Sequence, residues 1–319
     1  MTVHLKQDEP DTSNRLDGMK QGVIGQPISR VEGLAKVTGT APYAAEYPIE
    51  GCVEGVLATA TITRGEILKI HKDSVLGMPG VIAVIDDPRL TTRAAQGTAN
   101  EAPQQSPRTV CYWGQPIALV VAETFEQARD AAKHLAVEYR PDDGAPLSPD
   151  AVQPEEQEDE TVRQGDLVHA MSEAAHSVDV TFTTKGHASA AMEPHAAIAQ
   201  WDGDQLTVHA SLQMLNYNIS ELADAIDLPE EKVRLVSRFV GGGFGSKLGV
   251  SEETVAAAIA AMQLERPVRV VMSRQQVFQC IMRRSETTQR LRLAADQKGR
   301  LTGFGHEALV SNLPGETFA

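Results

Sequence analysis

The segment VGGGFGSK, residues 240–247, separates a predicted strand that ends at Val240 from a predicted helix that begins near Glu252. Four glycines within five residues allow positive φ angles and let backbone N–H groups approach a ligand closely, so the segment predicts contact with an anionic or oxo ligand. A tight strand-to-helix loop without a ligand explains the same glycines equally well. The spacing matches neither the Walker phosphate loop nor the dinucleotide pattern GxGxxG.

Strand and helix patterns alternate on both sides of this loop. Alternating apolar and polar residues predict a strand at 176–184, and apolar runs or helical spacing predict the elements after it. In chain order these are a strand at 206–211, a helix at 216–226, a strand at 232–240, a helix at 252–262 and a buried strand at 268–272.

The same alternation extends toward the N-terminus. The almost continuous apolar run QPIALVVA, residues 115–122, predicts a buried strand. Thr124 is a candidate N-cap for a helix whose small and apolar residues recur between Phe125 and Leu135, and residues 136–139 return as a strand. The sequence therefore predicts the α+β fold class.

Composition divides the chain into four parts. Residues 1–22 are polar and predict a mobile tail. Between residues 140 and 166 there are four prolines and nine acidic residues, so 143–165 is interpreted as an exposed, mobile linker. We therefore expect one domain at 23–142 and a second at 166–319.

Charge and cysteine content exclude several classes of function. The chain has 43 acidic and 29 basic residues and a net charge of -14, whereas nucleic-acid binding needs Lys and Arg to neutralise phosphates. No apolar run approaches the roughly 18 residues that a membrane span needs, and none suits a signal peptide. Cys52, Cys111 and Cys280 lie far apart without CxxC spacing, so any iron–sulfur cluster is expected on a partner.

Two further segments carry polar residues in positions that suit a site. The segment HASAAMEPH, residues 187–195, holds two histidines and one glutamate, which fits either a turn with satisfied polar groups or a metal site. Gln213 follows a predicted strand, and by itself this position indicates nothing.

Taken together and in order, these motifs resemble the xanthine dehydrogenase and aldehyde oxidase family. MEPHA at 192–196, LQM at 212–214 and GGGFGSK at 241–247 are similar to the first molybdopterin-binding domain of that family. EGLAKVTGTAPY at 32–43 and GQPIA at 114–118 resemble its a/b hammerhead domain. Within the family, the likeness is greatest to bacterial aldehyde oxidoreductase large subunits that bind molybdopterin cytosine dinucleotide.

The resemblance implies a set of cofactor contacts. Gln213 would donate a side-chain N–H to an oxygen of the molybdenum centre, which suits an oxo acceptor better than a carboxylate would. The motif at 192–195 would order the pocket wall, and Glu193 is not assigned as a base. No residue is expected to ligate the metal directly. The loop residues implied as cofactor contacts are Gly242, Gly243, Phe244 and Gly245, with the Phe244 backbone near an apical oxo group.

One departure from the family pattern concerns the substrate. Members that oxidise purines carry a glutamate directly after the loop lysine, where this chain has Leu248. An apolar side chain cannot hydrogen-bond a heterocycle, so aldehydes are the expected substrates and carboxylic acids the products, with water as the oxygen source. Arg283 and Arg284 could hold the pocket or the phosphates of the cofactor, or could be solvated arginines before a strand.

A second departure concerns length, because family members continue well beyond 319 residues and carry the catalytic glutamate in that continuation. The expected partners are therefore a C-terminal half of the molybdenum subunit, an iron–sulfur subunit with [2Fe-2S] clusters and an FAD subunit. The chain is expected to be inactive alone and to lie in the cytoplasm, or in the periplasm if a signal-bearing partner exports it. The alternative function is a non-catalytic binding or assembly module.

Overall fold

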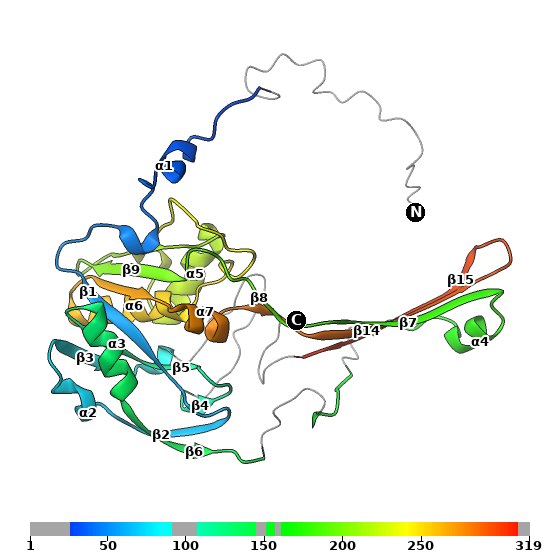
Figure 1. Ribbon diagram of the computed structural model, residues 1–319, viewed down its shortest axis with the longest axis horizontal. Helices are drawn as coiled ribbons and strands as arrows, with labels where there is room; N and C mark the ends of the chain where they lie inside the picture. The colour runs from blue at the N-terminus through cyan, green and yellow to red at the C-terminus, as the bar shows by residue number, and fades with distance from the viewer. Residues whose placement is uncertain (1–25, 91–106, 145–150, 157–160, 312–319) are drawn as a thin grey trace. The chain divides into compact units, whose positions relative to one another are not determined.

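The computed structural model describes residues 26–90, 107–144, 151–156 and 161–311 (Figure 1). Residues 26–41 belong to one compact unit, which contains helix α1 (Gly33–Val37), and residues from 42 onward form a second. The predicted tail at 1–22 lies outside the described residues. The described linker residues 151–156 and 161–165 are exposed, and their mobility stays a prediction.

Among the described residues, seven strands of the second unit form a mixed sheet in the order β11-β10-β9-β12-β1-β5-β3. Its strands are β1 (Val53–Thr59), β3 (Val81–Ile85), β5 (Pro116–Ala122), β9 (Ala196–Trp201), β10 (Leu206–Ala210), β11 (Val233–Val236) and β12 (Val268–Val271). Strand β1 pairs in parallel with β12, with Val53 opposite Val268. This pairing joins strands from both predicted domains in one sheet, while the boundaries at 142 and 166 stay a prediction.

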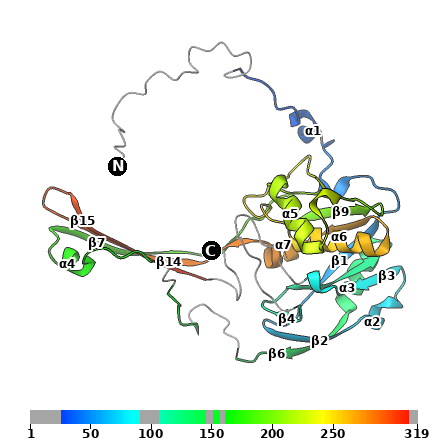
Figure 2. The same cartoon turned by 180° about the vertical axis from the view of Figure 1, so that it is seen from behind.

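Helices cover both faces of this sheet (Figures 1 and 2). Helix α3 (Phe125–His134) packs against one face through a cluster that includes Ala58 and Val120. Helix α6 (Glu252–Leu264), joined by α5 (Leu215–Ile226), belongs to the larger cluster that includes Leu57 and Leu119. Because side chains alternate along a strand, these two sets of residues lie on opposite faces. Every residue of β5 is buried, as its apolar run predicts.

The N-cap prediction at Thr124 is confirmed. Its hydroxyl oxygen accepts from the N–H of Gln127 at 3.3 Å, and the Gln127 side chain accepts from the N–H of Thr124 at 3.1 Å. This reciprocal capping satisfies two backbone donors that a helix N-terminus otherwise leaves free. The cap fixes where α3 leaves β5.

Smaller sheets and helices complete the second unit. Strands β4 (Thr109–Val110), β2 (Gly65–His71) and β6 (Ala136–Pro141) form one sheet, β15 (Leu301–Val310), β14 (Thr287–Ala295) and β7 (His176–Thr184) form another, and β8 (His187–Ala188) pairs with β13 (Arg283–Arg284). Further helices with bounds in the described ranges are α2 (Asp73–Leu76), α4 (Leu167–Ser172), α7 (Arg274–Cys280) and the short 3-10 turns η1 (Ala44–Glu46), η2 (Pro88–Leu90) and η5 (Glu230–Lys232). No helix in the described ranges is long and apolar enough to cross a bilayer.

Two strands differ from their sequence patterns. The alternation at 176–184 predicts a half-buried strand, yet every residue of β7 is exposed, because β7 pairs only along its edge with β14. The predicted strand at 232–240 ends early, at Val236. Its neighbour β10 ends at Ala210, and the last pair in the ladder joins His209 to Val236. Residues 237–240 therefore have no strand to pair with.

Candidate functional site

Three consecutive residues of the glycine loop after β11 have backbone N–H groups without an acceptor in the part of the chain that the structure describes. Gly242, Phe244 and Gly245 have φ angles of 100°, 53° and 92°. Phe244 is the only one of these with a side chain, and the left-handed region costs such a residue about 1 kcal/mol or more. The N–H groups of Gly242, Gly243 and Phe244 donate to no acceptor among the described residues. The loop therefore presents a row of N–H groups that suits an anion or an oxo ligand.

Gln213 lies directly against this loop, at the point where β10 leads into α5. The side-chain oxygen of Gln213 accepts from the backbone N–H groups of Gly245 and Lys247, at 3.2 and 3.3 Å, and the backbone N–H of Gln213 donates to the Lys247 carbonyl at 2.7 Å. In a carboxamide only the oxygen accepts hydrogen bonds, and here it accepts from two backbone donors. The NH₂ group of Gln213 is therefore left to donate to another group. A Cβ atom added to Gly243 would lie 2.2 Å from the Gln213 oxygen. Glycine at 243 is what lets this side chain approach.

A buried ion pair lies behind the loop. Lys247 is fully buried, and its Nζ donates to the Glu193 carboxylate at 2.9 Å, to the Glu193 carbonyl at 3.1 Å and to the Ser211 hydroxyl at 2.9 Å. The Glu193 carboxylate also accepts from the N–H of Gly241 at 2.7 Å. Burial lowers the pKa of Lys247, and the hydrogen bond and charge of Glu193 oppose that shift. The pair ties the first and last residues of the glycine loop to one carboxylate.

Two side chains of the segment 187–195 also form hydrogen bonds with carbonyl groups of the glycine loop. Ser189 donates to the Phe244 carbonyl at 3.4 Å, and the buried His195 bonds the Ser246 carbonyl through Nε2 at 2.9 Å. Among the described residues there is no cluster of three or more His, Cys, Asp or Glu side chains that could hold a metal ion. Ser189 and His195 therefore hydrogen-bond to carbonyls of the glycine loop.

His195 makes stability depend on pH. Burial first, with the charge of Lys247 adding to it, lowers its pKa from 6.5 to about 4. Because the unfolded chain takes up this proton at higher pH than the folded chain, the contribution of His195 to stability is complete above pH 6.5 and is lost as pH drops toward 4, by on the order of 3 kcal/mol. In urea unfolding at a series of pH values, the free energy of unfolding of His195→Asn relative to the unchanged chain should rise by on the order of 3 kcal/mol as pH falls from 6.5 toward 4. For the exposed His306→Asn this difference should not vary with pH, and a difference independent of pH for His195→Asn would contradict the assignment.

Glu253 gives the opposite dependence. This carboxyl is buried at the start of α6, one oxygen accepts from the Thr254 hydroxyl at 3.0 Å, and the other has no partner. Burial raises its pKa from 4.5 to about 7, so stability that is present below pH 4.5 is lost as pH rises through 7. Glu253→Gln should raise the free energy of unfolding at pH 8 by on the order of 3 kcal/mol and change little at pH 4.5. The exposed Glu230→Gln is the control. Equal effects of Glu253→Gln at both pH values would contradict the raised pKa of Glu253.

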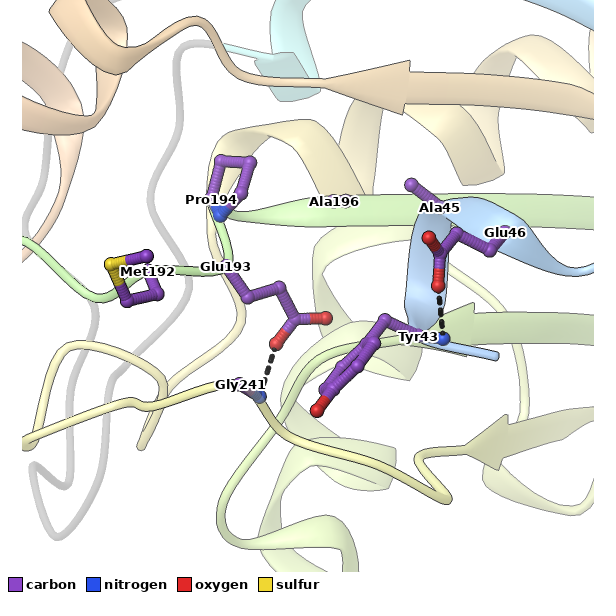
Figure 3. Close-up of a pocket in the computed structure, with 8 residues that line it drawn as sticks. All are labelled: Tyr43, Ala45, Glu46, Met192, Glu193, Pro194, Ala196 and Gly241. Carbon is purple, nitrogen blue, oxygen red and sulfur yellow. Dashed lines mark hydrogen bonds between the residues drawn. The ribbon is translucent and has the colours of Figure 1, made fainter. Parts of the chain in front are cut away.

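A cavity of about 350 Å³ lies beside the start of the loop (Figure 3). Glu193 points toward Gly241 across it, and the ring of Tyr43 lies opposite. Gln213 and Phe244 do not line this cavity, and both are exposed. Gln213 and Phe244 instead both lie at the exposed surface of the glycine loop. The full lining is Tyr43, Ala45, Glu46, Met192, Glu193, Pro194, Ala196 and Gly241.

The remaining predicted residues lie at different distances from the loop. Leu248 is half-buried and its carbonyl accepts from the side chain of Asn218 at 2.7 Å, next to the loop residues in sequence. Arg283 lies in β13 opposite Ala188. Its neighbour Arg284 is closer, because a Cβ added to Gly245 would meet the Arg284 guanidinium at 2.3 Å. Arg284 thus contacts the loop at Gly245.

Sequence reasoning did not single out Lys247 as buried, nor Ser211 as its partner. A lysine at the end of a glycine-rich segment reads equally well as a solvated residue. Only the position of Glu193 beside it distinguishes the two, and these residues are 54 apart in the chain. The donor set fits an oxo-bearing cofactor, because the N–H groups of Gly242, Gly243 and Phe244 have no acceptor among the described residues and the Gln213 carboxamide lies beside Gly243.

Comparison with known proteins assigns the chain to a family. Residues 38–143 match the aldehyde oxidase and xanthine dehydrogenase a/b hammerhead domain, and residues 151–314 match the molybdopterin cofactor-binding domain. The chain belongs to the aldehyde oxidase and xanthine dehydrogenase family. The predicted resemblance and the predicted fold class, a hammerhead domain followed by a molybdopterin-binding domain, are confirmed.

Individual relatives agree with this assignment. The chain is 39% identical to the aldehyde oxidoreductase molybdenum-binding subunit PaoC of Escherichia coli, over 98% of this chain and 43% of that subunit. It is 27% identical to the nicotinate dehydrogenase large molybdopterin subunit of Eubacterium barkeri, over 89% of this chain and 69% of that subunit. Its fold is similar to aldehyde oxidoreductase from Desulfovibrio gigas, with a TM-score of 0.75 and 24% identity, over 88% of this chain and 34% of that one. The chain spans less than half the length of the Escherichia coli subunit.

Proposed function

We propose that this chain forms the part of a molybdenum-dependent aldehyde oxidoreductase that contacts the cofactor through Gln213 and the glycine loop. The observation that carries the proposal is the arrangement of unpartnered donors: the N–H groups of Gly242, Gly243 and Phe244 beside the carboxamide of Gln213. When bound, the cofactor would supply the two-electron oxidation of an aldehyde to a carboxylic acid, with water as the oxygen source.

The residues of this chain have separate tasks in the proposal. The free loop N–H groups and the Gln213 NH₂ group would donate to oxygens of the cofactor. Glycine at position 245 leaves the loop open to the cofactor, because a side chain there would collide with Arg284. Glu193 and Lys247 hold the two ends of the loop without touching the ligand. No residue of this chain is assigned as the general base.

The proposed substrates are aldehydes rather than purines. Leu248 follows the loop lysine, and an apolar side chain offers no polar group to a heterocycle. The similarity to an aldehyde oxidoreductase subunit supports the same substrate class. In the complete enzyme, kcat/KM for an aromatic aldehyde such as benzaldehyde should exceed that for xanthine by roughly 100-fold or more.

The proposal includes a cofactor form and partners. The cofactor would be molybdopterin cytosine dinucleotide, and [2Fe-2S] and FAD subunits would carry the electrons away. A C-terminal half of the molybdenum subunit would complete the cofactor contacts. The support is that the relative in Escherichia coli is itself a molybdenum-binding subunit, while Cys52, Cys111 and Cys280 of this chain lie apart in the sequence. A cytoplasmic location, or a periplasmic one by co-export, belongs to the same proposal.

Molybdenum content and aldehyde-dependent dye reduction test the function together. The chain is expressed with and without candidate partner subunits encoded beside it. Molybdenum and turnover should both be high in the assembled complex and low in the chain alone, because half of a site loses preorganised contacts. A complex that assembles without molybdenum and reduces no dye would instead show a binding or assembly module.

A further inference from the structure

A second cavity, of about 270 Å³, lies on the sheet beside β10 and β11. Thr207 and His209 of β10 are paired with Arg234 and Val236 of β11, so their side chains point to one face of the sheet. Arg238 follows β11 on the same side of the cavity, and Tyr47 comes from the segment after η1. The cavity shares no lining residue with the one beside Gly241.

Two buried polar atoms at this cavity have no hydrogen-bond partner in the described part of the chain. They are the Tyr47 hydroxyl and Nδ1 of His209, whose rings lie 4.1 Å apart between centroids and are tilted by 36°. Leaving such groups unpaired costs on the order of 1–3 kcal/mol each, so native proteins rarely do so without a reason. Burial, with the charges of Arg234 and Arg238 adding to it, lowers the pKa of His209. The ring is therefore neutral at pH 7, with one N–H to donate.

Two guanidinium groups at the same cavity are also without an anionic partner. Arg234 and Arg238 are exposed, and neither forms an ion pair with a carboxylate among the described residues. Acidic residues outnumber basic ones, 43 to 29, so two unpaired arginines side by side are unexpected. The lining includes no carboxylate that could neutralise them.

We propose that Arg234, Arg238 and Tyr47 form a binding site for the phosphate group of a small molecule. Two guanidinium groups match the charge of a phosphate dianion, and Thr207, Tyr47 and His209 offer further donors for its oxygens. A carboxylate carries half that charge and would leave one guanidinium unpaired. The cavity volume of about 270 Å³ also leaves room for a group attached to the phosphate. This site does not depend on the function proposed for the glycine loop.

Calorimetric titration of the intact chain with inorganic phosphate tests the site. Phosphate should bind, and Arg234→Gln and Arg238→Gln should each weaken binding roughly tenfold. Tyr47→Phe keeps the ring against His209 and removes only the hydroxyl, so it should weaken binding by a smaller factor. The matched control is Arg300→Gln, because Arg300 is an exposed arginine paired with Asp296 at the β14–β15 turn. Thermal unfolding of each variant verifies that the fold is kept.

A second arm separates a small phosphate ligand from a protein carboxylate. The Arg234→Gln/Arg238→Gln variant is co-expressed with the partner subunits, and assembly of the complex is measured. Loss of phosphate binding with normal assembly supports the proposal. Two results overturn it: phosphate binding that persists in the double variant, or no phosphate binding by the unchanged chain. In the second case, failed assembly of the variant would show that the two arginines bind a carboxylate of a partner subunit instead.

Discussion

Lys247→Met is expected to lower the free energy of unfolding by about 3–5 kcal/mol. The substitution removes the ammonium group that donates to the Glu193 carboxylate, while Ser211 and the N–H groups of Gly241 and Ala44 remain as its donors. A buried carboxylate without its cation loses far more than an exposed one, because water cannot replace the lost partner. The measurement is urea unfolding at pH 7, followed by circular dichroism, with the midpoint and slope fitted separately.

An exposed ion pair of similar length provides the control. Lys232 pairs with Asp204 at 2.8 Å, and the side chains are 41% and 85% exposed, against 0% and 10% for Lys247 and Glu193. Lys232→Met should therefore change stability by less than about 1 kcal/mol. Adding Glu193→Gln to Lys247→Met should recover part of the loss, because the neutral amide no longer leaves a charge buried. Equal small effects at both lysines would show that burial does not govern the pair.

Local pattern was enough to predict the strand at 115–122 and the start of the helix after it, whereas the strand before the glycine loop ends four residues earlier than predicted. The run at 115–122 is apolar at nearly every position because β5 is buried on both faces, and Thr124 caps the next helix as its residue type suggests. Long-range pairing was not predictable in this way. Neither Val53 nor Val268 has any feature that names its partner, so the parallel pairing of β1 with β12 appears only in the structure.

The residues of the candidate site also differ in whether the sequence predicts them. Gln213 and the glycine loop were found from ordered motifs, and the structure brings them into hydrogen-bond contact. The burial of Lys247 was not, because nothing in its neighbours distinguishes it from a solvated lysine. Tyr47 and His209 carry no motif at all. Their importance comes from two atoms that lack partners in three dimensions.

Gly243→Ala is expected to reduce aldehyde oxidation by the complete enzyme by roughly 10- to 100-fold, with a shift in stability of about 1 kcal/mol or less. The new methyl group would lie 2.2 Å from the Gln213 oxygen and 2.5 Å from its amide carbon. Because Gly243 does not have a positive φ, the backbone accepts alanine and the side chain must move instead. Displacing Gln213 breaks its bonds to Gly245 and Lys247 and removes its N–H from the cofactor side.

A double-mutant cycle identifies the cause of the lost activity. If the methyl group acts by moving Gln213, then Gly243→Ala and Gln213→Ala should each lower kcat/KM, and the double variant should lose little more than Gln213→Ala alone. The control is Gly77→Ala, which makes the same chemical change at the end of α2, where no atom lies within 4 Å of the added Cβ. Molybdenum content is measured beside activity in every variant. Losses that add fully in the double variant would mean that Gly243 and Gln213 act independently, and that the contact between them does not position the carboxamide.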